Sequence, residues 1–126
     1  MDDDIVWTIN DYWDGCTMGI ADFENNHCIY ERIFDEKKDE WSNNYYLTPI
    51  SQADFLVVVQ DWERWKKWRL DFDNGIKSTS SWEKGIDLEA IARNSSDYRK
   101  TIRYGKFMGD WRCCESMTVK WNKSTV

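Results

Sequence analysis

The chain has 126 residues, of which 41% are hydrophobic and 32% are charged, so it can form one buried core and is not expected to be disordered. No run approaches the ~20 apolar residues needed to span a bilayer, and the acidic start Asp2-Asp3-Asp4 differs from the basic start of a secretory signal. We therefore expect one domain over residues 1–126, located in the cytoplasm with its cysteines reduced.

The net charge of −6 hides an uneven distribution along the chain. Residues 1–63 carry 15 acidic and 3 basic side chains, a balance of −12, and residues 64–126 carry 8 acidic and 14 basic ones, a balance of +6. Two interpretations follow. The two halves fold against each other and their fields cancel, or an acidic face remains on the folded protein and attracts basic partners.

The first third of the chain predicts strands. β-branched and aromatic residues favour strands at 5–9, 16–23, 27–34 and 41–48, and Glu24-Asn25-Asn26 favours a tight turn. Strands that follow one another through short turns indicate an antiparallel meander.

The next block changes to helical spacing. Ser51 is expected to cap a helix, with Asp54 as the acid of a capping box. One face of that helix is apolar and the opposite face is charged: Phe55, Val58, Val59, Trp62, Trp65 and Phe72 against Glu63, Arg64, Lys67 and Asp71.

A second helix is predicted to begin near Asp87 and to end at Gly105, a residue suited to a helix C-terminus. Its expected buried stripe is Leu88, Ile91, Ala92, Ser95, Tyr98 and Ile102. Alternation over residues 117–121 then predicts a final strand, and residues 107–114 could form a further one. The order of elements predicts an α+β fold, in which an antiparallel β-meander packs against two helices and a C-terminal strand returns to the sheet.

No compact catalytic motif is present. The sequence contains no phosphate-binding glycine loop, GxSxG elbow, HExxH or CxxC pair, which argues against the commonest nucleotide-binding, hydrolase and zinc-site designs. His27 is the only histidine, and its neighbour Cys28 points to the opposite face of a strand, so we expect no metal and no cofactor.

Two interpretations remain for His27. It shares one strand face with Glu31, and Asp14 or Asp22 could approach it, which would make an acid–base group. The alternative is a hydrogen-bonded histidine near a turn with a solvated glutamate, and we favour this second interpretation.

The Trp-rich segment at residues 61–69 also has two interpretations. Trp62 and Trp65 belong to the core face of the helix, whereas Trp68 lies at its edge beside Lys66, Lys67 and Arg69. Aromatics interleaved with cations can stack the bases of single-stranded nucleic acid. We favour a core helix with solvated basic side chains, because a protein of pI near 4.8 repels phosphates.

The N-terminal pattern resembles a family of small uncharacterised bacterial proteins. The matching segments are Trp13-Asp14-Gly15, the GIADF run at 19–23, His27 to Glu31, Phe34-Asp35, the LTPI run at 47–50 and the Asp-Trp-Glu-x-Trp helix at 61–65. The resemblance covers residues 13–68 and extends loosely to a final strand at 117–121, with Cys16 where a proline is usual. It implies one domain of similar length and no particular activity.

These observations predict a non-enzymatic interaction module, of the inhibitor or immunity type, that binds a basic protein partner. The candidate binding surface is Trp13, Asp14, Asp39, Trp41 and Tyr45. A second hypothesis is a small-molecule-binding protein or weak enzyme that uses Asp14, His27 and Glu31. A third is nucleic-acid binding through Lys66, Lys67, Arg69, Arg99, Lys100 and Arg103.

Overall fold

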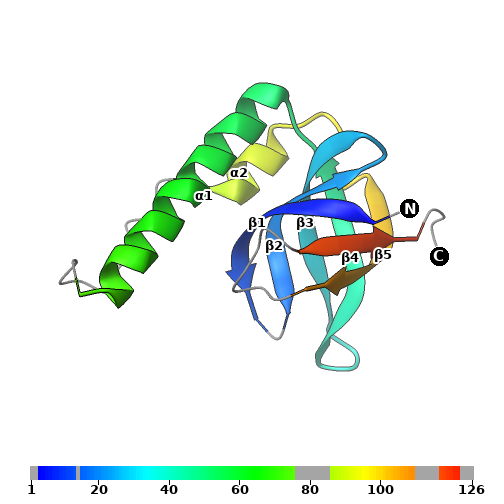
Figure 1. Cartoon of the computed structure of the whole chain (residues 1–126). Coiled ribbons are helices and arrows are strands. Elements are labelled where there is room, and N and C mark those ends of the chain that lie inside the picture. The colour runs from blue at the N-terminus through cyan, green and yellow to red at the C-terminus, as the bar shows by residue number, and fades with distance from the viewer. Residues whose placement is uncertain (1–2, 14, 76–85, 110–116, 123–126) are drawn as a thin grey trace.

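The chain forms a closed six-stranded barrel with helices on its outside (Figure 1). The computed structural model describes residues 3–13, 15–75, 86–109 and 117–122. The strands follow one another around the barrel as a meander, each antiparallel to the next, and the last pairs with the first. The elements in chain order are β1 (Asp4–Tyr12), β2 (Cys16–Phe23), β3 (Asn26–Asp35), β4 (Glu40–Pro49), α1 (Gln52–Asp73), α2 (Leu88–Arg93), β5 (Thr101–Met108) and β6 (Thr118–Trp121).

The predicted fold class is therefore wrong in its architecture. An α+β sheet packed against two helices was expected, but the sheet closes on itself because β6 pairs with both β5 and β1. Asp4 lies opposite Val119 and Ile5 opposite Thr118, so the C-terminal strand joins the two ends of the meander. The sheet curves around its own core, and one long helix, α1, lies on the outside of the barrel.

The four N-terminal strands form where the alternation of the sequence predicts them, within three residues at each end. Side chains alternate between the barrel interior and its outer wall, as in any strand. The interior contains aromatic and aliphatic side chains from all six strands: Val6, Ala21, Phe23, Cys28, Tyr30, Tyr45, Leu47, Phe107, Val119 and Trp121. The absence of a side chain at Gly19 is required here, since a Cβ would lie 2.2 Å from the Thr8 carbonyl oxygen of β1.

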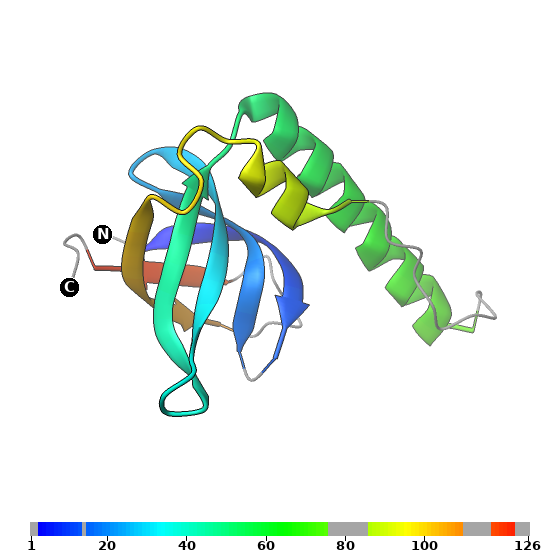
Figure 2. The same ribbon diagram turned by 180° about the vertical axis from the view of Figure 1, so that it is seen from behind.

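The helices cover the outer wall of β2 and β3 (Figure 2). Ile20 and Ile29 point outward from these strands and pack against Phe55 and Val58 of α1 and Leu88 and Ala92 of α2. The predicted start of α1 is confirmed, because Ser51 Oγ accepts a hydrogen bond from the Asp54 backbone N–H at 3.1 Å.

The predicted second helix is wrong beyond its first two turns. α2 ends at Arg93, and the residues that follow turn back to the sheet and form β5, with Gly105 inside that strand. Arg99 turns the chain with a positive φ of 55°, and its backbone N–H donates to Thr48 Oγ1 at 3.0 Å. Residues 94–97, Asn-Ser-Ser-Asp, favour turns over helix interiors, which explains why the helix stops there.

Candidate interaction groove

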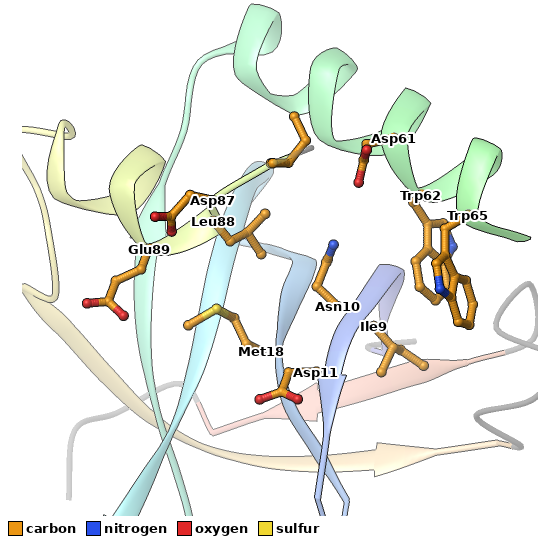
Figure 3. A pocket seen from close by; sticks show the side chains of 11 residues that line it. Ile9, Asn10, Asp11, Met18, Asp61, Trp62, Trp65, Asp87, Leu88 and Glu89 are labelled. Atoms are coloured by element: carbon orange, nitrogen blue, oxygen red, sulfur yellow. The ribbon is translucent and has the colours of Figure 1, made fainter. Parts of the chain in front are cut away.

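A groove runs between the second half of β1 and the second half of α1 (Figure 3). It consists of two adjoining hollows of about 520 and 610 Å³ that share Ile9, Asn10, Asp11, Trp62 and Trp65. The first extends to Met18 and α2, and the second to Tyr12 and the end of α1. Because four consecutive residues of β1 line it, the groove follows the strand lengthwise.

The groove exists because α1 is longer than the surface that it covers. A helix of 22 residues is about 33 Å long, and its buried residues, Phe55, Val58, Asp61 and Trp62, all lie in its first half. The second half projects past the strands in both views of the fold (Figures 1 and 2). Leu70, on this projecting half, is 60% exposed.

The helix side of the groove presents stacked indoles. The rings of Trp62 and Trp65 are nearly parallel, at 14°, with centroids 5.0 Å apart. Trp62 is buried in the same cluster as Ile9, and Trp65 packs against that cluster while remaining partly exposed. The barrel therefore fixes the first ring, and the first ring positions the second.

The two hollows differ in charge. Among the lining residues that the structure describes, the hollow next to α2 contains four carboxylates and no Lys or Arg: Asp11, Asp61, Asp87 and Glu89. The other hollow contains Lys66 and Arg69 with Asp11 and Asp73. The α2 end of the groove is thus suited to a cationic group.

The four carboxylates have different local roles. Asp87 caps α2 by accepting from the Ala90 N–H at 3.2 Å, and Glu89 pairs with Arg93 on the same helix. Asp61 is buried and accepts from Arg64 Nη2 at 3.1 Å. Asp11 is exposed, and no hydrogen bond or ion pair reaches its side chain from the described residues.

The structure does not bring the predicted acid–base residues together. Asp14 lies outside the described residues. His27 and Glu31 share the outer face of β3, but four residues of strand separate their Cα atoms by about 13 Å. Glu31 is 4% exposed and is held by Arg99, with Nη2–Oε2 at 2.8 Å and Nε–Oε1 at 3.3 Å.

His27 instead pairs with Asp22 across the β2–β3 hairpin, with Nδ1 and Oδ1 2.6 Å apart. Trp7 Nε1 donates to the same Asp22 oxygen at 2.8 Å. The imidazole stacks on Phe55 at 3.6 Å and 11°, so this cluster attaches the hairpin to the first turn of α1. The carboxylate fixes the orientation of the ring, as it does in acid–base sites.

The predicted binding residues lie in different places. Trp13 is 70% exposed and directly follows Tyr12, which lines the groove. Asp39 and Trp41 flank the start of β4, where Trp41 packs against Phe34 and lies beside Arg32. Tyr45 is buried inside the barrel, where its hydroxyl donates to the Cys16 carbonyl at 3.3 Å.

Most of the cations proposed for nucleic-acid binding are already paired. Five of the six contact a carboxylate: Lys66 with Glu63, Lys67 with Asp71, Arg69 with Asp73, Arg99 with Glu31 and Lys100 with Asp97. A phosphate backbone would have to compete with each of these acids, which disfavours this function.

Sequence reasoning placed Trp62 and Trp65 in the core and did not identify the groove. Asn10, Asp11, Asp61, Asp87 and Glu89 were not singled out as site residues either. A signal was nevertheless present, because an apolar stripe on a helix of 22 residues exceeds what the neighbouring strands can cover.

The known proteins give no independent indication of function. The chain matches no protein-family model, and neither the curated proteins nor the solved structures contain a significant match. Among the described residues, no group of three or more His, Cys, Asp or Glu could hold a metal ion. Neither α1 nor α2 has both the length and the apolar content that crossing a bilayer requires.

Proposed function

We propose that the protein is a non-enzymatic interaction module that holds a cationic segment of a partner protein in the groove between α1 and β1. The supporting observation is the α2 end of this groove, where the lining within the described part of the chain has four carboxylates, no Lys or Arg, and a stacked Trp pair. Carboxylates accelerate the encounter with a basic protein, and indoles supply the buried contact. An inhibitor or immunity-type protein acts in this way.

The dimensions of the groove support a peptide segment as its occupant. From Asp61 to Asp73, α1 spans about 18 Å along the groove. That length corresponds to roughly five or six residues of extended chain. The two hollows also fall within the ~300–1,000 Å³ range of ordinary ligand sites.

We place this module in the cytoplasm, and its free cysteines support that location. Cys16 and Cys28 are buried and unbridged, as expected where thiols are kept reduced. The resemblance to small bacterial proteins implies no activity, so the proposed function depends on the groove.

The test is affinity purification from the native host with three forms of the tagged protein. Wild type is compared with an Asp11→Asn/Asp61→Asn double variant and with Asp71→Asn, which removes one carboxylate of α1 that lines neither hollow. A basic protein retained by wild type and Asp71→Asn, lost with the double variant and released by salt is the expected result. Equal retention by all three forms, or no partner above background, would contradict the proposal.

The Asp22–His27 pair favours one alternative, a small-molecule-binding protein or weak enzyme. Its contact of 2.6 Å orients the imidazole, although Glu31 is not available to it. The chain has a single histidine, so its ring signals in an NMR spectrum are unambiguous. Compounds that shift both the His27 ring and the Trp7 indole signals would support this alternative.

A further inference from the structure

Asp61 lies next to the Trp pair at the α2 end of the groove. It precedes Trp62 directly and Trp65 by four residues, and side chains four apart are neighbours on a helix surface, with Cβ atoms about 5–6 Å apart. Figure 3 shows the Asp61 side chain directed from α1 into the space above Asn10. A carboxylate and an indole face are thus presented to the same volume.

The Asp61 carboxylate already binds a guanidinium group. Its side chain is only 10% exposed, and a carboxylate that is largely removed from water needs a cationic or hydrogen-bonding partner. Arg64 Nη2 supplies this partner at 3.1 Å, but the Arg64 side chain is 68% exposed and does not line the groove. The buried carboxylate must keep a cationic partner, but Arg64 holds its place from solvent, so another cation that enters from the groove can replace it without leaving Asp61 unpaired.

A cation that enters from the groove gains contacts that Arg64 does not have. Asp11 of β1 and the stacked rings of Trp62 and Trp65 line the same hollow as Asp61. Arginine is better suited to this site than lysine, because its planar guanidinium binds a carboxylate with two parallel hydrogen bonds, stacks on aromatic faces and is weakly hydrated.

We infer that the partner segment is anchored by an arginine side chain that stacks on the Trp62–Trp65 pair and replaces Arg64 at the Asp61 carboxylate. This inference rests on the proposed function, since it names the residue that the groove selects. Arg64 then competes with the ligand from within the chain. Removing Arg64 should therefore tighten binding, whereas removing a contact residue should weaken it.

The probes are three synthetic peptides, acetyl-Leu-Arg-Leu-Arg-Leu-amide and its counterparts with lysine or with neutral citrulline at both Arg positions. Binding is measured by calorimetry and by the indole N–H signals of the full chain in NMR. We expect the arginine peptide to bind about tenfold more tightly than the lysine peptide and the citrulline peptide to show no binding.

Single-residue variants of α1 distinguish binding through an arginine anchor from general charge attraction. Arg64→Gln should tighten binding of the arginine peptide by about threefold to tenfold, and Asp61→Asn should abolish the preference for arginine over lysine. Trp65→Leu should also abolish the preference for arginine over lysine. This variant tests the anchor independently if Asp61→Asn impairs folding. Lys67→Gln is the matched control for Arg64→Gln, because Lys67 also pairs within α1 but lies outside the groove lining, and it should leave the affinity unchanged.

The outcomes distinguish the inference from the proposed function. Equal affinity for arginine and lysine peptides, or no effect of Arg64→Gln, overturns the arginine anchor and leaves the groove as a site for basic segments. Absence of peptide binding, with groove-dependent capture of a host protein, also overturns the anchor. Absence of both peptide binding and capture overturns both. Self-association that depends on Asp61 would show that a second copy of the chain occupies the groove, and it would overturn the anchor as well.

Discussion

Replacing Gly105 with alanine should destabilise the closure of the barrel. Gly105 lies opposite Trp121 in the β5–β6 pair, and a Cβ on Gly105 would lie 2.3 Å from Trp121 Cζ3 and 2.6 Å from Cε3. Non-bonded carbons prefer a separation of about 3.5–4.0 Å. The indole or the strand must therefore move by more than an ångström.

Trp121 has little freedom to make that movement. It is 7% exposed, its Nε1 donates to the Asp22 carbonyl at 3.0 Å, and its ring contacts Tyr45 and Phe107. Overpacking in such a site costs about 1–3 kcal/mol, and loss of the indole hydrogen bond costs about 1 kcal/mol more. The sum, about 2–4 kcal/mol, is a large fraction of the roughly 5–15 kcal/mol that stabilises an ordinary domain.

The assay is urea unfolding followed by circular dichroism for Gly105→Ala, Trp121→Leu and the double variant. Leucine removes the aromatic ring that the new methyl group meets, so the double variant should be more stable than the sum of the single effects by about 1–3 kcal/mol. Gly75→Ala is the control, because Gly75 has a φ of +77° and no atom of the described residues lies within 4 Å of its Cβ position. It should lose only about 1 kcal/mol through backbone strain. A Gly105→Ala protein within about 0.5 kcal/mol of wild type, or strict additivity in the double variant, would refute the steric argument.

Two further predictions concern buried polar groups. Glu31→Gln should lower the free energy of unfolding by about 1–3 kcal/mol, because it removes the buried charge that pairs with the partly solvated Arg99. The same urea experiment measures this change, and an unchanged urea midpoint would contradict the prediction. Burial raises the pKa of Cys16 to about 11 and that of Cys28 to about 12 from 9.0, so both thiols stay protonated in the folded protein while those of the unfolded chain ionise. The contribution of the two thiols to stability should be complete below pH 9 and should decline as the pH rises toward 11. In a variant without the other two cysteines, a thiol reagent at pH 8 should react only after unfolding. Fast labelling of the folded form would contradict the prediction.

Local patterns in the sequence predicted the local structure well. The β2–β3 hairpin follows from two alternating strands around Asn25, and both Glu24 and Asn25 adopt the positive φ that such a turn requires. Ser51 was recognisable as a cap because its hydroxyl meets the N–H three residues later, a contact encoded within four positions. Each of these features depends on neighbours in the chain.

Closure of the barrel depends on contacts that local patterns do not contain. The pairing of Asp4 with Val119 joins residues 115 positions apart, and no periodicity at either end specifies the partner strand. The misassigned helix illustrates a related limit. Leu88, Ile91, Ala92 and Ile102 happen to fall at helical spacing, but Ile102 belongs to β5, where pairing with Tyr46 of β4 overrides the pattern.

The sequence did not reveal the groove for a different reason, and that reason also indicates which residues should contribute most of the binding energy. Trp62 and Trp65 are core residues by their spacing, and Trp62 is indeed buried, so the same stripe serves both the barrel and the projecting helix. Because the barrel holds Trp62 and Trp62 stacks on Trp65, the Trp65 ring is ordered before a ligand arrives, and binding loses little side-chain entropy. Trp68 stacks instead on Phe72, farther along α1, and both belong to the half of the helix that projects beyond the strands. Of these two stacked pairs, the Trp62–Trp65 pair, which the barrel fixes, is therefore expected to contribute more of the binding energy.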